Sequence, residues 1–315
     1  MCGIVGYVGN KNAQDFLISG LKRLEYRGYD SAGIVTLDTD GGATLLRAKG
    51  KISNLEEKLA ENKREDKIGI GHTRWATHGE PSEANAHPHR AGAIYLVHNG
   101  IIENYKELKE HLTEHEFKSE TDTEVLAALV NSFYAEGKYP LTNAVVQALK
   151  LVKGTYGVAV VSTKNPEEIV VARSGSPLVI GVGHDETLIA SDASALVGHT
   201  KQAIYLNDGE VARITKNSVE IKTLNAEPVS AKVEEIETNL AAIQKGGYEH
   251  FLLKEIMEQP LSLAETLRGR VNLEQGTVRL GGPGLSEAEL RKIKHLIIVG
   301  CGTAYHAGLL ASYYI

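Results

Sequence analysis

Cys2 is the residue with the most obvious chemical potential, because it follows the initiator methionine and precedes Gly3. Methionine aminopeptidases generally remove methionine before a small residue, so we expect Cys2 to begin the mature chain. Its α-amine would then titrate near ~7.7–8.0 and could act as a general base at neutral pH. Its thiol is the strongest side-chain nucleophile available. One residue would supply both nucleophile and base, although a small second residue without any catalytic role is also common.

Asn99 and Gly100 could complete a site for acyl transfer at Cys2. Their side-chain and backbone N–H groups are suitable donors for a tetrahedral oxyanion, and such donors are typically worth ~10²–10³ in rate each. The alternative is structural, because Asn-Gly is the most common sequence of a tight hairpin turn. The residues alone leave both interpretations open.

Arg74 and Asp122 match the two charges of an amino-acid substrate. The planar guanidinium suits a carboxylate, and the aspartate suits an ammonium group. Alternatively, both could be surface charges, or Asp122 could only cap a helix. Trp75, the sole tryptophan, lies among polar residues, which favours a loop over the core.

Three histidines in the same region could suggest a metal site. They are His78, His87 and His89, and their spacing matches no standard zinc pattern. Pro88 indicates a loop between the last two. The sequence therefore predicts no metal.

Short β patterns rich in Val, Ile and Tyr dominate the first 225 residues. We expect strands over residues 4–8, 33–37, 43–48, 68–73, 94–98, 156–162, 169–172, 178–182, 188–191, 203–206 and 211–214. We expect helices over residues 13–24, 53–60, 104–112, 123–134 and 141–152. Many strands without strict βαβ alternation predict an α+β domain of two antiparallel sheets flanked by helices. The chemically notable residues then lie where strands end, as working residues often do.

The pattern changes after about residue 227. Residues 229–247 are polar and end in two glycines, which indicates a linker. A helix is expected over residues 249–267 with a break near Pro260, and a short one over 286–294. Residues 295–300 predict a buried parallel-type strand, followed by a helix from about Tyr305. Because one strand cannot pair its own backbone groups, we expect residues 248–315 to be the truncated first part of an α/β domain.

Composition excludes several classes of protein. The chain of 315 residues is 42% apolar and 23% charged, and its net charge of −6 gives no basic surface for nucleic acid. No apolar run reaches the ~18 residues of a membrane helix, and the first residues lack a signal-peptide pattern. The two cysteines, Cys2 and Cys301, make no disulfide scaffold. A thiol nucleophile persists best in a reducing compartment, so we predict a cytoplasmic protein.

Together, these segments resemble the glutamine–fructose-6-phosphate aminotransferase family. The resemblance covers essentially the whole chain and rests on MCGIVG (residues 1–6), LEYRGYDSAG (24–33), HTRWATHGEP (72–81), HNGIIEN (98–104), SETDTE (119–124), ARSGSPL (172–178), ASD (190–192), KEIMEQP (254–260) and CGT (301–303). It implies a four-layer αββα N-terminal nucleophile glutaminase domain over residues 1–228 and a linker over 229–247. Residues 248–315 would begin a sugar isomerase (SIS) domain.

The resemblance also implies a role for each residue of the glutaminase site. Cys2 would attack the amide of glutamine, form a glutamyl thioester and release ammonia, while Asn99 and Gly100 hold the oxyanion. The side chains that bind glutamine would be those of Arg27, Arg74, Thr77, His78 and Asp122. Trp75 would gate a channel that carries ammonia to a sugar site.

At that sugar site the family converts fructose 6-phosphate to glucosamine 6-phosphate. Thr303 would contact the sugar phosphate, and Ala304 stands where the family commonly has serine. The resemblance implies no metal and no organic cofactor, and a homodimer formed through the isomerase domains of the full-length enzyme. Residues 1–315 alone would act only as a glutaminase.

Two alternatives stay open at the level of the sequence. One is another amidotransferase with an N-terminal cysteine, such as amidophosphoribosyltransferase or asparagine synthetase. Residues 295–303 argue against it, and no Asp-Asp-containing phosphoribosyl-pyrophosphate loop is present. The other is a non-catalytic regulatory module, which would require an incomplete site.

Overall fold

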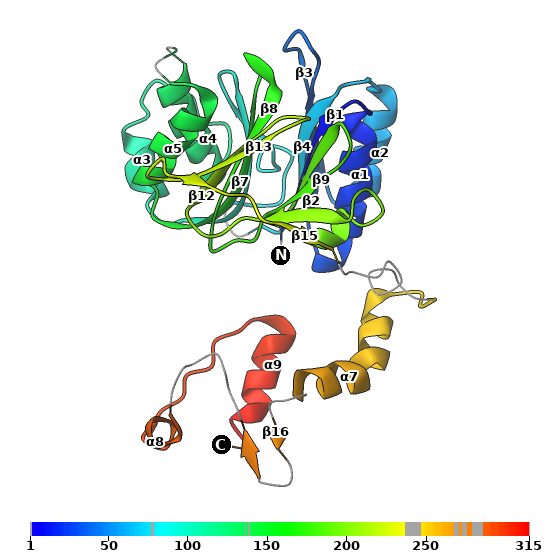
Figure 1. The fold of residues 1–315 in the computed structure, drawn as a ribbon, viewed down its shortest axis with the longest axis vertical. Coiled ribbons are helices and arrows are strands. Elements are labelled where there is room, and N and C mark those ends of the chain that lie inside the picture. Colours follow the sequence, from blue (N-terminus) through cyan, green and yellow to red (C-terminus); the bar gives the residue numbers. More distant parts are fainter. Residues whose placement is uncertain are drawn as a thin grey trace. The chain divides into compact units, whose positions relative to one another are not determined.

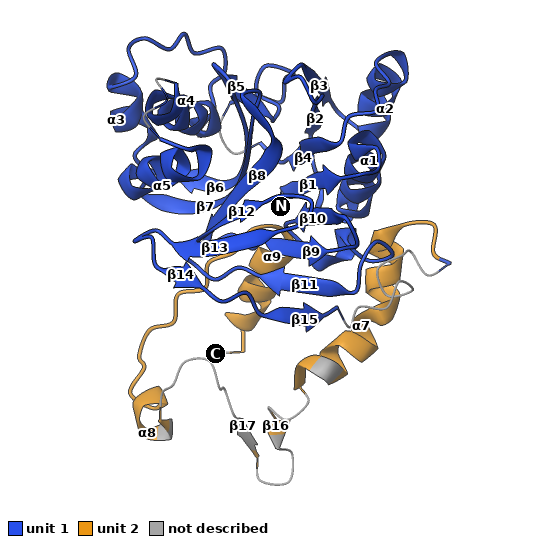
Figure 2. Ribbon diagram, turned by 45° about the horizontal axis from the view of Figure 1, so that its top comes forward, with its two compact units in different colours: residues 1–247 blue, residues 248–315 orange. Residues whose placement is uncertain are grey.

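The chain forms two compact units, residues 1–247 and residues 248–315 (Figure 2). The computed structural model describes residues 2–76, 79–135, 137, 139–236, 247–267, 271–272, 276–278 and 286–314. Each unit is considered by itself, and the candidate nucleophile Cys2 belongs to unit 1.

Unit 1 contains two antiparallel sheets (Figure 1). The first has the order β15-β11-β9-β10-β1-β4-β2-β3 and consists of β1 (Gly3–Gly9), β2 (Ser31–Leu37), β3 (Ala43–Lys49), β4 (Ile68–Arg74), β9 (Val179–Val182), β10 (Glu186–Ala190), β11 (Gln202–Tyr205) and β15 (Val233–Glu235). The second has the order β14-β13-β12-β8-β7-β6-β5 and consists of β5 (His89–Ala91), β6 (Ile94–Ile102), β7 (Gly154–Ser162), β8 (Asn165–Ser174), β12 (Glu210–Ile214), β13 (Val219–Thr223) and β14 (Pro228–Val229).

Helices cover the outer face of each sheet, which gives four layers. The helices are α1 (Ala13–Arg23) and α2 (Ile52–Glu61) on the first sheet, and α3 (Tyr105–Glu110), α4 (Asp122–Tyr134) and α5 (Leu141–Leu151) on the second. Apolar side chains such as Ile4, Ile70 and Val97 fill the space between the two sheets. Because both faces of each sheet are buried, β1 and β4 are buried throughout rather than alternating. The prediction of two antiparallel sheets flanked by helices is confirmed.

Two 3₁₀ turns and four short strands, β5, β13, β14 and β15, add detail to unit 1 that the sequence patterns did not predict. The turns, Glu25–Arg27 and Ala193–Ala195, follow α1 and β10. The strand β15 pairs with β11, so the first sheet extends into the segment 229–247 that was expected to be a linker. Residues 237–246 of that segment lie outside the described residues.

Unit 2 contains α7 (Phe251–Leu267), α8 (Glu287–Leu290), α9 (Gly302–Ala311) and a two-stranded ribbon of β16 (Val271–Asn272) and β17 (Thr277–Val278). Helix α7 runs through Pro260 without the expected break. The prediction of a buried strand over residues 295–300 is wrong, because this segment forms no strand and Val299 is 90% exposed. A strand needs a neighbour for its backbone groups, and the described part of unit 2 pairs none with it.

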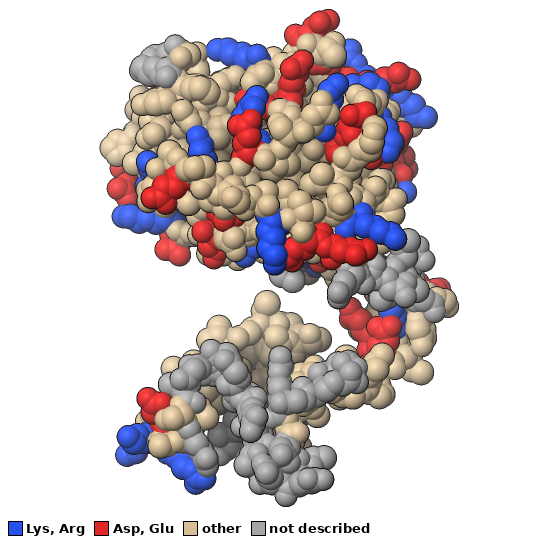
Figure 3. All heavy atoms as spheres, viewed as in Figure 1, with Lys and Arg blue, Asp and Glu red and all other residues tan. Residues whose placement is uncertain are grey.

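Charged side chains are mixed over the surface of unit 1. On the face in Figure 3, lysine and arginine side chains lie among aspartates and glutamates, and neither sign forms a continuous field. None of the helices that the structure describes is long and apolar enough to cross a membrane.

Candidate active site

The pairing of β1 with β4 places Cys2 beside Trp75. Gly3 lies opposite Thr73 in this ladder, so the residue before β1 meets the residue after β4. The backbone N–H of Trp75 donates to Cys2 Sγ at 3.2 Å, and the thiol in turn lies 3.6 Å from the Trp75 carbonyl oxygen. The partly buried thiol is therefore held by backbone at the end of two central strands of the first sheet.

The second sheet brings Asn99 to the same place. Asn99 Nδ2 donates to the backbone carbonyl of Cys2 at 3.2 Å. Asn99 and Gly100 lie within β6, opposite Gly157 and Tyr156 of β7, so the hairpin-turn interpretation is wrong. Both candidate oxyanion donors thus lie on a strand that approaches the nucleophile from the other sheet.

Gly100 is required by the backbone that it adopts. Its φ is +133°, and a Cβ at this position would lie 2.1 Å from the carbonyl oxygen of Thr155. Only glycine avoids this overlap, and the β6–β7 ladder continues through it to Ile102.

Arg74 and Asp122 are buried, which rules out their interpretation as surface charges. Arg74, at the end of β4, is 4% exposed and its Nη2 donates to the Gly79 carbonyl at 3.4 Å. Asp122 is 6% exposed, and its Oδ2 accepts the N–H of Ile102 at 2.8 Å. It is the first residue of α4, and the N-cap is Thr121 instead.

The Trp75 side chain lies against the segment that contains Arg27. The Trp75 side chain is 54% exposed, and its ring lies against Gly28, where a Cβ would come within 2.5 Å of Cζ3. Arg27 Nη1 donates to Ser191 Oγ at 3.1 Å. That hydroxyl also accepts the N–H of Ile4 at 3.0 Å, so Arg27 is linked to the strand that carries Cys2.

Burial raises the pKa of the Cys2 thiol. The N–H of Trp75 and the positive charge of Arg74 oppose this effect. Because the thiol is mainly protonated at neutral pH, nucleophilic attack requires a base that removes its proton. The α-amine that the sequence suggests depends on Met1, which lies outside the described residues.

Sequence reasoning missed two residues that position the site. Asp30 Oδ2 accepts the N–H of Ala76 at 2.6 Å, and its own N–H donates to the Arg74 carbonyl at 2.8 Å. His72 Nε2 lies 2.9 Å from Asn99 Oδ1. Both residues belong to segments whose composition attracted attention, but only the strand register shows what they contact.

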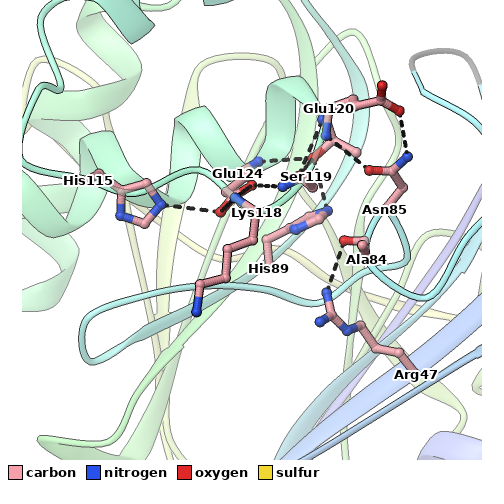
Figure 4. Close-up of polar contacts among 10 residues, drawn as sticks. Arg47, Ala84, Asn85, His89, His115, Lys118, Ser119, Glu120 and Glu124 are labelled. Atoms are coloured by element: carbon pink, nitrogen blue, oxygen red, sulfur yellow. Dashed lines mark hydrogen bonds and ion pairs between the residues drawn. The ribbon is translucent and has the colours of Figure 1, made fainter.

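A polar network fixes the start of α4, where Asp122 lies (Figure 4). Glu124 accepts the backbone N–H groups of Lys118 at 2.9 Å and Ser119 at 2.6 Å, and it contacts the His115 ring at 3.3 Å. Asn85 and Glu120 exchange two hydrogen bonds, each 3.0 Å long. A buried carboxylate with several donors is well stabilised, so this network holds the helix end rigidly.

The remaining candidate residues lie outside the described part of unit 1. Thr77 and His78 lie outside the described residues. Thr303 and Ala304 are exposed residues of α9 in unit 2. Within the part of the chain that the structure describes, no group of three or more His, Cys, Asp or Glu side chains is arranged to hold a metal ion.

Comparison with known proteins identifies the family of the chain. The sequence profile of the glutamine amidotransferase domain matches residues 58–250. The chain belongs to the glutamine amidotransferase family. The matched range includes β4, β6 and α4.

Curated relatives resemble the chain over its full length. Glutamine–fructose-6-phosphate aminotransferase (isomerizing) from Chlorobaculum tepidum is 49% identical over an alignment of 323 positions, which covers 100% of this chain and 52% of that protein. The enzyme of the same name from Thermus thermophilus is 49% identical, over 99% of this chain and 51% of its own length. The chain therefore spans about half the length of the curated relatives it matches.

Two solved structures share the fold. Glutamine phosphoribosylpyrophosphate amidotransferase from B. subtilis is 29% identical with a TM-score of 0.59, covering 71% of this chain and 49% of its own. A structure described as the allosteric regulatory enzyme of purine biosynthesis is 30% identical with a TM-score of 0.61 and the same coverage. The N-terminal nucleophile fold of glutamine amidotransferases is thus common to all three.

Proposed function

We propose that unit 1 hydrolyses glutamine to glutamate and ammonia with Cys2 as the nucleophile. The observation that carries this proposal is the meeting of two sheets at one point, where Cys2 contacts both Trp75 and Asn99. A thiol with an adjacent N–H₂ donor is the core of an acyl-transfer site. Membership of the glutamine amidotransferase family supplies the substrate class.

The reaction follows from the positions of these groups. The α-amine takes the proton of the thiol, and the sulfur attacks the amide carbon of glutamine. The carbonyl electron pair moves to oxygen, and Asn99 Nδ2 and the Gly100 N–H stabilise that oxyanion. When the carbonyl re-forms, the C–N bond breaks, the nitrogen takes the proton from the α-ammonium, and ammonia leaves a glutamyl thioester. Water then cleaves the thioester to glutamate and restores the thiol.

Buried opposite charges select the amino-acid end of the substrate. Arg74 binds the α-carboxylate and Asp122 the α-ammonium. We include Arg27, Thr77 and His78 among the residues that bind glutamine, by the family resemblance. Trp75 gates the exit of ammonia, which agrees with its exposed ring beside Gly28.

For the whole protein we propose the activity that names its curated relatives. Ammonia from Cys2 would pass to fructose 6-phosphate, in a cytoplasmic homodimer joined through sugar isomerase domains. Unit 2 would begin the first such domain, with Thr303 and Ala304 in a sugar-phosphate site. The 49% identity, measured over an alignment that spans both units, supports this extension.

The glutaminase proposal is tested by ammonia release from glutamine. Cys2→Ala removes the nucleophile, so we expect release to fall to the uncatalysed level. Cys301→Ala is the matched control, because it deletes the other thiol, which is exposed in unit 2. Unchanged release by Cys2→Ala would contradict the mechanism.

A second test concerns the base. Retention of Met1, verified by intact mass, converts the α-amine of Cys2 into an amide without basicity. We expect such protein to be inactive while the processed protein is active. Full activity with Met1 retained would refute a base supplied by Cys2 itself.

A further inference from the structure

Four buried histidines lie beside the proposed site, and the mechanism uses none of them. His72, His87, His89 and His98 are each at most 4% exposed. The rings of His72 and His87 stack with centroids 4.2 Å apart, and His87 meets His89 edge-on at 4.8 Å. Burying a polar ring is costly unless its nitrogens make hydrogen bonds, so the contacts of each nitrogen indicate what the ring does.

The orientation of the Asn99 amide is fixed by Cys2. Asn99 Nδ2 lies 3.2 Å from the Cys2 carbonyl oxygen, which can only accept a hydrogen bond. The amide nitrogen must therefore face Cys2, and Oδ1 must face the other way. There it meets His72 Nε2 at 2.9 Å.

This contact determines which nitrogen of His72 carries the proton. An amide oxygen accepts but cannot donate, so Nε2 must donate. Burial lowers the pKa of His72 to about 3, despite the opposing hydrogen bond with Asn99. The ring is thus neutral near pH 7 and has a single N–H, which is on Nε2. Nδ1 is buried and makes no hydrogen bond within the described part of the chain.

The other tautomer would disturb the site. With the proton on Nδ1, the lone pairs of Nε2 and Oδ1 would face each other at 2.9 Å. Asn99 could relieve this repulsion by rotating its amide by half a turn. Its oxygen would then face Cys2, and the oxyanion would lose its side-chain donor.

We infer that His72 is a positioning residue, whose Nε2–H holds the Asn99 amide with its nitrogen directed at the reacting centre. This inference rests on the proposed glutaminase function. His72 touches neither substrate nor thiol, and it acts only through Asn99. His87 supports the ring of His72 by stacking, which any flat ring could do.

A near-isosteric pair of variants tests the role of the Nε2 donor. His72→Gln places an amide N–H where Nε2 was, whereas His72→Met has similar length and no donor. We expect His72→Met to lower kcat for ammonia release by ~10–10², below the ~10²–10³ of a deleted oxyanion donor. KM should change less than about threefold, because the groups that bind the substrate's charges are retained. His72→Gln should recover most of the lost kcat.

A double-mutant cycle separates positioning from general damage. In an Asn99→Ala background, His72→Met should cause no further loss of kcat, because the group that it positions is already gone. A merely structural role would reduce kcat by the same factor in both backgrounds. The inference would be overturned if the double variant lost kcat by the product of the two single-variant factors, or if His72→Met alone kept full activity.

His87→Phe is the matched control, because it replaces the neighbouring ring and leaves the His72–Asn99 contact intact. We expect its kcat to equal that of the wild type.

Nitrogen NMR of the unmutated protein gives a readout that does not depend on variant folding: the His72 ring should be protonated at Nε2, and protonation at Nδ1 would overturn the inference. If the proposed glutaminase function itself were wrong, the result would be different: either the wild type would release no ammonia, or Cys2→Ala would still release it.

Discussion

Units 1 and 2 differ in how far they bury their apolar side chains. Unit 1 has three apolar clusters, one between its sheets and one beneath each helical layer. Unit 2 exposes large apolar side chains along α7 and residues 296–299, including Leu252, Met257, Leu261, Leu263, Leu296, Ile297 and Val299. The alignment to the relatives nevertheless extends over both units. The glutaminase chemistry that we propose therefore lies in the unit that buries its apolar side chains.

The two units also differ in their histidines. Unit 1 buries four of them, whereas the described histidines of unit 2, His250, His295 and His306, are exposed. This contrast leads to the largest effect that we expect, which is an acid sensitivity confined to unit 1.

Acidification should unfold unit 1 between about pH 6 and pH 4. Burial lowers the pKa of His72 and His89 to about 3, and lowers those of His87 and His98 as well. Below about pH 6.5 the unfolded chain binds these protons and the folded chain does not. The buried neutral histidines therefore contribute fully to the unfolding free energy above the pKa of histidine in the unfolded chain. This contribution is lost as the pH falls, by up to about 1.4 kcal/mol per pH unit for each histidine. Urea unfolding followed by circular dichroism at several pH values measures this slope.

His87→Phe sharpens the same measurement. This variant removes one buried titrating ring. The slope of the unfolding free energy against pH should therefore decrease by the contribution of one histidine. An unfolding free energy that is flat between pH 7 and pH 5 would show that the histidines are not buried as described.

Gly100→Ala should be the most damaging single substitution in unit 1. The new Cβ would lie 2.1 Å from the Thr155 carbonyl at a φ of +133°, and backbone on the paired strand cannot move aside without breaking the β6–β7 ladder. We expect a loss of more than about 4 kcal/mol of unfolding free energy. Gly209→Ala is the control, because its φ is +81° with no atom near its Cβ, and it should cost about 1 kcal/mol. Equal costs would contradict the crowding argument.

The strands of unit 1 could be predicted because their composition and bounding residues are local signals. Residues 4–8 and 68–73 were expected as strands, and Gly3–Gly9 and Ile68–Arg74 are strands. The extent of β6 was underestimated, since Asn99 and Gly100 suggest a turn unless β7 is known to pair with them. The prediction of a strand over residues 295–300 was wrong because an apolar run suggests a strand, whereas a strand forms only where a second strand pairs with its backbone groups.

The site was predictable in residue type and not in arrangement. Cys2, Asn99, Arg74 and Asp122 were singled out because their chemistry is recognisable in any context. Their burial and the Cys2–Asn99 contact depend on register between segments almost a hundred residues apart. His72 was missed because a lone histidine in a strand carries no signal until its neighbour is known.

Asp122→Asn should give the next largest effect, on catalysis rather than folding. The amide keeps an oxygen that can accept the Ile102 N–H, and it loses the charge that would bind the substrate ammonium. A hydrogen bond to a charged group is worth about 1.5–3 kcal/mol, so kcat/KM for glutamine should fall by ~10². Steady-state ammonia release measures this. Asp15→Asn on the exposed side of α1 is the control. An unchanged kcat/KM in Asp122→Asn would show that Asp122 does not bind the substrate.

The smallest effect should come from Leu261→Ser in unit 2. This side chain is 64% exposed on α7, so serine removes little apolar contact, and surface changes usually stay within about 0.5 kcal/mol. The same substitution at Leu126, which is 1% exposed on α4, removes a core side chain and buries a hydroxyl, at a cost of roughly 3–5 kcal/mol. Ammonia release and the urea midpoint of unit 1 should be unchanged in the first variant and strongly reduced in the second. Equal loss in both would mean that the glutaminase site depends on α7, and the contrast between the two units would fail.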